Sequence, residues 1–493
     1  MKTLLPIAAL AAALAAVAVP AFSQAPRQPA PLREIADQVS EERLKADVER
    51  LVGFGTRHTL SARDHPTRGI GAALNWTEAE FGRISRECRG CLEIVRTGDT
   101  VTGRRIPEPT LVENVVAIQR GTGDPNRVVI ITGHIDSRVT DPMNATADAP
   151  GANDDGSGTA AVIEAARVLS RHRFAGTIVY AALSGEEQGL IGGRILADYA
   201  RAQGWQVGAN LNNDIVGNSC GSDNVCDDAH VRVFSEGLRW QGGDALRAQV
   251  RSLGGENDSP SRNLSRFLAT LAQELGLGLE VRQIWRNDRF GRGGDHTEFL
   301  NAGFPAVRFS VAVENYDAQH QDLRTEMTRE QAGMDCPHCP PEARGRTYGD
   351  TVDRMDFPYL RRVTQLNVAA LARLARAPMP PQPVVEGAVS TDTTVRWPWD
   401  HLTREFVVRW RRTDASQWEH SRRIVLAAPG CAPPHCLMLP RDDVDVVLRG
   451  IRVDDWTFGV SSVAADGSES PVASAVPGGA FRPYVPSPPA SQP

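Results

Sequence analysis

The stretch GANDDGSGTA, residues 151–160, places two carboxylates side by side, Asp154 and Asp155, in a glycine-rich turn. Adjacent like charges repel each other, and no basic residue lies within the stretch to neutralise them. On an exposed loop, water would screen both charges at little cost. A bound cation is the alternative explanation. The choice depends on which other residues of this kind the chain brings to the same place.

Strand-like apolar runs alternate with helix-like segments on both sides of this turn. Helical spacing occurs in residues 33–54, 158–172, 190–204, 261–276 and 356–376, and strand-like runs in 111–120, 127–136, 177–184, 210–216 and 304–311. The alternation predicts an α/β fold with a mixed, mostly parallel sheet sandwiched by helices. We expect 111–120 and 127–136 to be antiparallel neighbours, because the turn between them is too short for a crossover. Ser157 is expected to cap the helix that begins there.

The sequence pattern changes after residue 376. Residues 377–387 form a proline-rich linker, and residues 388–478 contain short alternating strands that predict a small all-β sandwich. The runs TTVRWPWD, FVVRWRR and DDWTFGVSSVAADGSESP resemble a fibronectin type III module. The tyrosine typical of that module is missing, and Trp456 or Phe458 would have to replace it. We expect the tail, residues 479–493, to be disordered.

The N-terminus has the features of a signal peptide. Within residues 1–25, Lys2 precedes an alanine- and leucine-rich run that ends in small residues suitable for cleavage. Pro6 and Pro20 bracket a run too short to span a membrane, so we expect a secreted or periplasmic protein without a membrane anchor. The formal net charge is -6 and no basic stripe is present, which argues against nucleic acid as a partner.

The eight cysteines fall into four close pairs, Cys88/Cys91, Cys220/Cys226, Cys336/Cys339 and Cys431/Cys436. In an exported chain this spacing predicts four local disulfides. Two pairs have the C-x-x-C spacing, so a zinc site with four thiolate ligands is the competing interpretation.

Residues suited to catalysis or metal binding occur at five places where predicted strands end or loops meet a helix. They are His134 and Asp136 in ITGHIDS, Asp154 and Asp155, Glu186 and Glu187 in LSGEEQG, Asp214 in NNDIVG, and His296 in GGDHTEF. Strand ends of this kind form the active site of an open α/β sheet. Each residue alone has an ordinary explanation, such as a helix cap. Together, imidazole and carboxylate donors suit zinc, and one carboxylate can bridge two divalent ions.

This ordered set, carried by GHIDS, GANDDGSG, SGEEQGL and GDHTEF, resembles the co-catalytic zinc aminopeptidase family over roughly residues 110–375. That family also includes glutamate carboxypeptidases and is related to glutaminyl cyclases. The resemblance implies a zinc exopeptidase fold for the domain of residues 26–376. It also implies two Zn²⁺ ions per chain and substrates that are peptides with a free N-terminus.

The resemblance also implies the roles of individual residues. Asp154 would bridge both ions and be followed by a cis peptide bond, and Asp155 would not be a ligand. The metal ligands would be His134, Asp154 and Asp214 at one ion, and Glu187, Asp154 and His296 at the other. Asp136 lies two residues beyond His134 on an extended strand, so it can accept the imidazole N–H. Glu186 points away from Glu187 and would be the general base.

Three alternatives remain open at this point. The same fold could act as a carboxypeptidase or dipeptidase, or as a glutaminyl cyclase with one zinc ion. An inactive peptidase-like scaffold that binds a partner is the alternative from a different functional class. His58 and His320 lie in polar segments that could frame a substrate pocket, but we expect a structural or surface role for both. The C-terminal β module could contact proteins or the cell wall.

Overall fold

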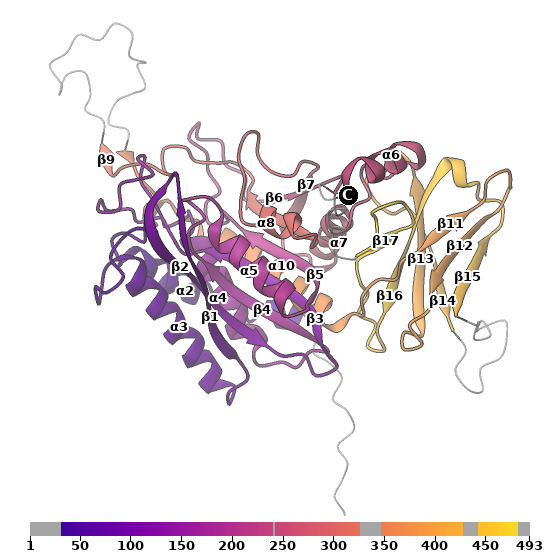
Figure 1. Cartoon of the computed structure of the whole chain (residues 1–493), viewed down its shortest axis with the longest axis horizontal. Coiled ribbons are helices and arrows are strands. Elements are labelled where there is room, and N and C mark those ends of the chain that lie inside the picture. The colour runs from indigo at the N-terminus through magenta and orange to yellow at the C-terminus, as the bar shows by residue number, and fades with distance from the viewer. Residues whose placement is uncertain (1–30, 240–241, 326–346, 427–441, 482–493) are drawn as a thin grey trace, which may run out of the picture.

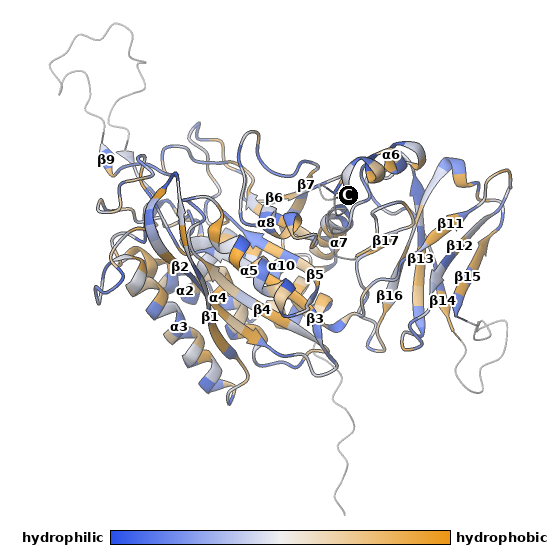
Figure 2. Ribbon diagram, in the orientation of Figure 1, coloured by the Kyte–Doolittle hydropathy of each residue, from blue (hydrophilic) through white to orange (hydrophobic). Residues whose placement is uncertain are grey.

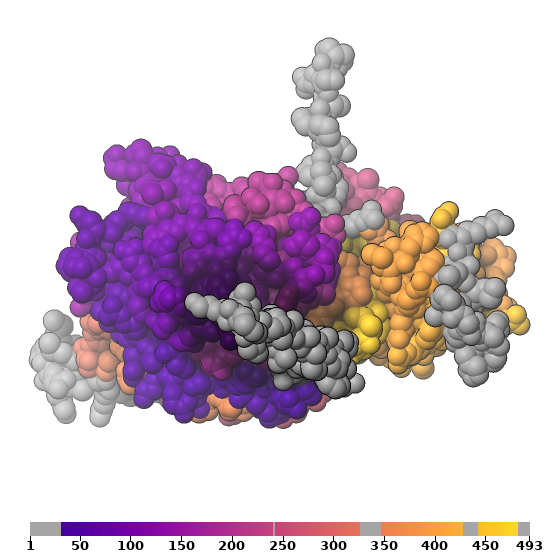
Figure 3. All heavy atoms as spheres, turned by 90° about the horizontal axis from the view of Figure 1, so that it is seen from below, coloured from indigo at the N-terminus to yellow at the C-terminus, as the bar shows by residue number. Residues whose placement is uncertain are grey.

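The computed structural model describes residues 31–239, 242–325, 347–426 and 442–481 of the chain. An α/β body and a β-sandwich lie side by side along the long axis of the molecule (Figures 1 and 3). This is the fold class predicted from the sequence. The predicted signal peptide, residues 1–25, lies outside the described residues.

In the described residues, the α/β body is built on an eight-stranded sheet with the order β1-β2-β4-β3-β5-β8-β6-β7. Its strands are β1 (Glu93–Gly103), β2 (Ile106–Gln119), β3 (Asp124–His134), β4 (Gly176–Leu183), β5 (Gln206–Asn213), β6 (His230–Ser235), β7 (Glu280–Ile284) and β8 (Ala306–Val311). The pairs β4-β3, β3-β5, β5-β8 and β6-β7 are parallel, and the other pairs are antiparallel.

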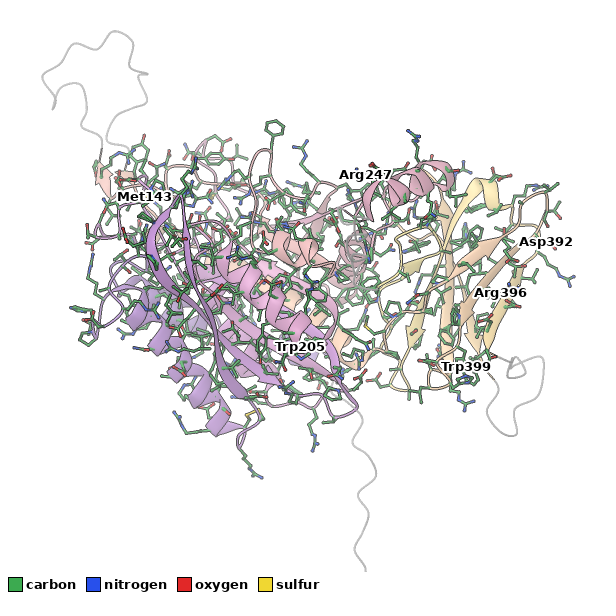
Figure 4. All side chains as sticks on the ribbon, viewed as in Figure 1. Met143, Trp205, Arg247, Asp392, Arg396 and Trp399 are labelled. Carbon is green, nitrogen blue, oxygen red and sulfur yellow. A yellow bond between two sulfur atoms is a disulfide. The ribbon has the colours of Figure 1, made fainter. Side chains whose placement is uncertain are left out.

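Helices cover both faces of this sheet because its central strands are apolar on both sides. The helices are α1 (Leu32–Ala36), α2 (Glu41–Val52), α3 (Gly69–Glu87), α4 (Gly156–Leu169), α5 (Ile191–Ala202), α6 (Gly243–Leu253), α7 (Pro260–Leu275), α8 (His296–Asn301) and α10 (Phe357–Arg376). One core joins the sheet to α1–α4, α7 and α10, and a second joins it to α5 and α8. Figure 2 shows the apolar residues of the strands between these layers. Trp205, labelled in Figure 4, belongs to the second core.

The predicted pairing of residues 111–120 with 127–136 is wrong. β4 lies between β2 and β3, so the two strands are not neighbours. The short turn leaves room for β4 because Thr122 and Gly123 donate hydrogen bonds to the carbonyls of Phe174 and Ala175, just before β4 begins. Because β4 is buried along its whole length, a central position with a strand on each side stabilises it more than a position at the edge of the sheet.

Helix ends also differ from the prediction in two places. Residues 33–54 form α1 and α2 rather than one helix, because the Ser40 side chain accepts a hydrogen bond from the Arg43 N–H and starts α2. Helix α4 is capped by Asp155, whose carboxylate accepts from the Gly158 N–H. Ser157 therefore lies inside the helix and is not its cap.

The C-terminal β-sandwich consists of two antiparallel sheets, β11-β12-β15 and β14-β13-β16-β17. Its strands are β11 (Val384–Glu386), β12 (Thr393–Pro398), β13 (Glu405–Arg412), β14 (His420–Val425), β15 (Asp443–Leu448), β16 (Trp456–Val463) and β17 (Ala473–Ser474). β11 falls in the predicted linker but pairs with β12, so the sandwich begins earlier than residue 388. The resemblance to a fibronectin type III module stays a prediction.

The sandwich is anchored to the α/β body by buried polar contacts. Arg411 on β13 forms an ion pair of 2.6 Å with Asp258, which lies two residues before α7, and both side chains are almost fully buried. Asn263 on α7 donates a hydrogen bond to Ser474 on β17. Phe481 is buried in the core of the α/β body, so residues 479–481 are ordered, contrary to the prediction. Residues 482–493 of the predicted tail lie outside the described residues.

Two of the four predicted disulfides, Cys88–Cys91 and Cys220–Cys226, are present. The pairs Cys336/Cys339 and Cys431/Cys436 lie outside the described residues. Among the described helices, none combines the length and the apolar character needed to cross a membrane. The remaining short elements are β9 (Arg324–Thr325), β10 (Thr347–Tyr348), η2 (Val352–Arg354) and η3 (Val453–Asp455).

Candidate active site

Polar residues meet where four neighbouring strands of the sheet end. β3 ends at His134, Glu186 and Glu187 follow β4, Asp214 follows β5, and His320 follows β8. These strands are adjacent and parallel, so their carboxyl ends lie at one edge of the sheet. The loop before α4 brings Asp154 to the same edge. Catalytic residues of open α/β sheets are expected at this edge.

Asp154 is at the centre of this cluster. Its Oδ1 lies 3.0 Å from His134 Nε2, and its Oδ2 lies 2.9 Å from His320 Nε2. Glu187 Oε1 is also 2.9 Å from His320 Nε2. Each oxygen of one carboxylate therefore faces a different histidine, and the second histidine also faces a second carboxylate. Gln319 donates a hydrogen bond of 2.8 Å to Asp154 Oδ2.

A second group of possible ligand atoms adjoins the first and shares His134 with it. His134, Glu186 and Asp214 each place one ligand atom within 4.8 Å of the others, as do His134, Asp154 and Glu187. His134 Nε2 lies 4.0 Å from Asp214 Oδ1. The predicted residues His134, Asp154, Glu186, Glu187 and Asp214 are thus brought together.

His296 does not take the predicted position. It begins α8, and its buried Nε2 lies 3.0 Å from the Asn287 carbonyl and 3.5 Å from Asp288 Oδ2. It belongs to neither group of ligand atoms, and His320 lies between Asp154 and Glu187 instead. The reason is topological: His320 follows β8, which adjoins β5, whereas His296 precedes that strand.

Asp136 contacts His134 differently from the prediction. The closest partner of His134 Nδ1 is the main-chain carbonyl of Asp136 at 3.0 Å, and the Asp136 carboxylate is 3.6 Å away. That carboxylate instead accepts hydrogen bonds from the backbone N–H groups of Glu186 and Glu187 and from the Thr59 hydroxyl. Asp136 therefore orients the histidine with its backbone and positions the Glu-Glu pair with its side chain.

Buried polar contacts hold the Asp154 loop in place. Asp155 accepts hydrogen bonds from the His134 and Gly158 N–H groups, and the peptide bond between Asp154 and Asp155 is cis, as the resemblance implied. Asp350 accepts from the Asp154 N–H at 2.7 Å. Sequence reasoning missed Asp350, because about 200 residues separate it from the loop and no local pattern links the two.

The carboxylates of the cluster favour positive charge on both of its histidines. Burial favours a neutral imidazole, yet the carboxylates of Asp136 and Asp154 raise the pKa of His134 well above its usual value. Burial also opposes charge on His320, but Glu187 and Asp154 raise its pKa to about 10. The carboxylates therefore create a strong demand for positive charge at this edge.

The pKa values of the carboxylates in the cluster are shifted in different directions. Burial would raise the pKa of Asp154, but His320 and His134 outweigh it and hold that pKa well below its usual value. At Glu186 burial prevails, reinforced by the negative charges of Asp214 and Glu187, so its pKa is raised well above the usual value. One carboxylate is thus kept ionised beside another that readily takes a proton.

The donor set fits divalent metal ions. Glu187 Oε1 lies 2.9 Å from His320 Nε2 but, within the described residues, accepts no hydrogen bond with proper geometry. Atoms about 2.0 Å from a tetrahedral zinc ion are about 3.3 Å from each other, close to the spacings in this cluster. Imidazole nitrogen and carboxylate oxygen are zinc ligands. The cluster can therefore hold metal.

The comparison with known families agrees with this geometry. Residues 114–369 match the model of Peptidase family M28, and this range contains all the residues of the cluster. The chain belongs to peptidase family M28. This M28 chain is 40% identical over 459 residues to a probable zinc metalloprotease of Leptosphaeria maculans, covering 92% of this chain and 99% of the relative. It is 39% identical over 459 residues to a probable zinc metalloprotease of Pyricularia oryzae, covering 91% and 85%.

Among solved structures, the M28 chain is similar to LapB from Legionella pneumophila, with 19% identity and a TM-score of 0.47 over 70% of this chain and 74% of that one. The predicted family is confirmed by the family match, and the curated relatives are probable zinc metalloproteases.

Proposed function

We propose that this chain is an exported aminopeptidase that uses two zinc ions to remove N-terminal residues from peptides. One observation carries the proposal: the two oxygens of Asp154 face two different histidines, His134 at 3.0 Å and His320 at 2.9 Å. A carboxylate that bridges two divalent ions presents its oxygens in this way. His134 and Asp214 would hold one ion, and His320 and Glu187 the other.

When bound, the two ions would polarise the scissile carbonyl and make a water molecule more acidic. Glu186 is placed to handle the proton, because it lines the catalytic cavity and lies in one group with His134 and Asp214. Its carboxylate would accept a proton from the attacking water and return it to the leaving amine. The raised pKa of Glu186 suits a group that must both accept and release a proton.

Asp136 supports this role as a positioning residue. Its carboxylate accepts hydrogen bonds from the backbone N–H groups of Glu186 and Glu187, which fixes the segment that carries both carboxylates. Glu187 is thereby held beside His320, and Glu186 would face the reacting water. Such outer contacts typically change metal affinity or activity by about 10–100-fold when they are removed.

Export and the role of the C-terminal sandwich also belong to the proposal. Residues 1–25 support a secreted or periplasmic location, as do the two local disulfides. The two-sheet arrangement of the sandwich is compatible with a fibronectin type III-like module. Contact with proteins or with the cell wall is the function we assign to it.

The proposal is tested with aminoacyl-anilides, matched N-acetylated anilides and metal analysis. The metal-loaded enzyme should cleave the free-amine compounds and lose nearly all turnover on the blocked ones. Glu186→Gln should keep two zinc ions per chain but lower kcat by about 10²–10⁴-fold. Glu280→Gln is the matched control, because Glu280 lies on β7 with its side chain 76% exposed and should leave kcat unchanged.

Other results would favour the alternatives. Cleavage of blocked peptides from the C-terminus would indicate a carboxypeptidase. Cyclisation of N-terminal glutamine with one essential zinc ion would indicate a glutaminyl cyclase. Metal binding without any turnover on these substrates would indicate an inactive scaffold. Normal kcat in Glu186→Gln would exclude Glu186 as the general base.

A further inference from the structure

A second cavity, of about 570 Å³, adjoins the catalytic cavity, whose volume is about 290 Å³. Arg289 and Arg292 line both cavities, so they form the boundary between them. The second cavity is open to solvent and is lined by β6, by the end of β7 with the loop that follows it, and by the loop after β8. The proposed proton transfers use none of these segments.

The walls of the second cavity carry a surplus of positive charge. Four arginines line it, Arg232, Arg286, Arg289 and Arg292, and Glu314 is the carboxylate among its lining residues. Glu314 is shared by three of them, at 2.5 Å from Arg232, 3.0 Å from Arg292 and 3.4 Å from Arg289. Within the described residues, Arg286 has no carboxylate partner. Such a cavity favours an anionic ligand.

Aromatic rings stand beside these arginines. Phe290 is 89% exposed and Tyr316 is 60% exposed, although both are large and line the cavity. The guanidinium of Arg286 lies over the Phe290 ring, 5.8 Å from its centroid. Exposed apolar surface next to positive charge indicates a ligand with both an apolar part and a negative group. A peptide carboxylate has both, whereas a small inorganic anion lacks the apolar part.

The second cavity lies at a short distance from the cluster. Gln319 bridges the two sites, since its amide donates to Asp154 Oδ2 at 2.8 Å and accepts from Arg292 at 3.4 Å. The Arg292 nitrogen is therefore at most about 8.5 Å from Asp154 Oδ2, because the nitrogen and oxygen of an amide group are about 2.3 Å apart. One extended residue spans about 3.3–3.6 Å. This distance corresponds to about two residues of a bound peptide.

With its metal ions bound, the catalytic cavity would not repel such a ligand. Besides Arg289 and Arg292, which are already counted with the second cavity, it is lined by Arg105 and Arg138 and by four carboxylates, Asp154, Glu186, Glu187 and Asp214. Two divalent ions, as in the proposed function, would add about four positive charges. The field along the path of the substrate then attracts anions.

We propose that the second cavity binds a carboxylate of the peptide substrate, about two residues beyond the scissile bond on the leaving-group side. Arg286 and Arg292 are the residues that determine this specificity. The carboxylate is either the C-terminus of a short peptide, such as a tripeptide, or an acidic side chain of a longer one. This inference rests on the proposed function and assigns its substrate class.

The test compares kcat/KM for one aminoacyl-anilide and four tripeptides that share the best N-terminal residue. Two tripeptides differ only in a free or amidated C-terminus, and two amidated ones differ only in aspartate or asparagine at the third position, two residues beyond the scissile bond. A carboxylate should raise kcat/KM by about tenfold or more. The first pair reports the C-terminus as the source, and the second pair reports an acidic side chain.

Arg286→Gln and Arg292→Gln should bring the ratio between charged and neutral substrates close to one. Using this ratio within each variant cancels any general loss of activity, which matters for Arg292 because it contacts Gln319. Arg247→Gln is the matched control, because Arg247 is exposed on α6 and lines neither cavity (Figure 4). It should keep the ratio of the unmodified enzyme.

The outcomes separate this inference from the proposed function. Cleavage of the anilide with equal kcat/KM for charged and neutral tripeptides would overturn the inference and leave the proposed function intact. A ratio that survives in both cavity variants would also overturn it. Failure of the metal-loaded enzyme to cleave the anilide and every tripeptide would overturn the proposed function, and the inference with it.

Discussion

If the chain holds the two proposed zinc ions, replacing His320 by alanine should remove one of them and leave the other. His320 Nε2 lies 2.9 Å from Asp154 and 2.9 Å from Glu187, so without His320 these two carboxylates alone would hold the ion at this position. Removing even an outer partner of a metal ligand costs about 10–100-fold in affinity. Loss of a direct ligand should therefore weaken binding at this site at least about 100-fold, or about 2.7 kcal/mol.

The assay is zinc content per chain after dialysis against buffers of defined free zinc, with circular dichroism as a check on folding. Over a range where the unmodified protein holds two ions, His320→Ala should hold one. His296→Ala is the informative comparison, because His296 contacts Asn287 and Asp288 rather than the cluster. It should keep two ions, although removing a buried ring should lower Tm.

Either of two results would refute this reasoning. If His320→Ala kept two ions with unchanged affinity, His320 would not be a ligand. If His296→Ala lost one ion while it remained folded, the position predicted from the sequence would be right and the one in the structure wrong.

Two further predictions concern stability. Arg411→Ala should lower the free energy of unfolding by up to about 3–5 kcal/mol, because it removes the closer ion-pair partner of the buried Asp258 and leaves it with Arg266 at 3.9 Å. Arg396→Ala, which removes an exposed ion pair on β12 (Figure 4), should cost less than about 1 kcal/mol in the same urea titration, and equal costs would contradict the role of the buried pair. Asp47 is buried on α2, and burial raises its pKa to about 7, so the folded chain keeps a proton there that the unfolded chain loses near pH 4. The contribution of Asp47 to stability should therefore fall as the pH rises from about 4 to 7, so the unmodified protein should lose up to about 4 kcal/mol over this range relative to Asp47→Asn; pH profiles of the two proteins that stay parallel would show the prediction to be wrong.

Much of the fold could be predicted because local patterns carry it. Apolar runs and helical spacing predicted β3, β4, β5 and β8 to within a few residues, together with α4, α5, α7 and α10. The order of the strands in the sheet could not be predicted from these local patterns. β4 enters between β2 and β3 because a fully buried strand needs two neighbours, and this depends on packing between distant segments.

Likewise, part of the candidate site could be predicted from the sequence and part could not. His134, Asp154, Glu187 and Asp214 lie at strand ends or in a glycine-rich turn, so residue type and position were enough to make them candidates, and the family resemblance implied which candidates are ligands. Asp350 could not be found, because its contact with the Asp154 backbone joins segments with no local relation.

By itself, the sequence determined which kinds of side chain stand at the ends of the strands, and hence a cluster suited to metal and peptide hydrolysis. The tertiary structure alone decided which histidine completes it. His296 and His320 lie on opposite sides of β8 in the sequence, and β8 runs parallel to β5. The carboxyl end of β8 therefore leads into the cluster, and the residue that follows this end, His320, reaches Asp154 and Glu187.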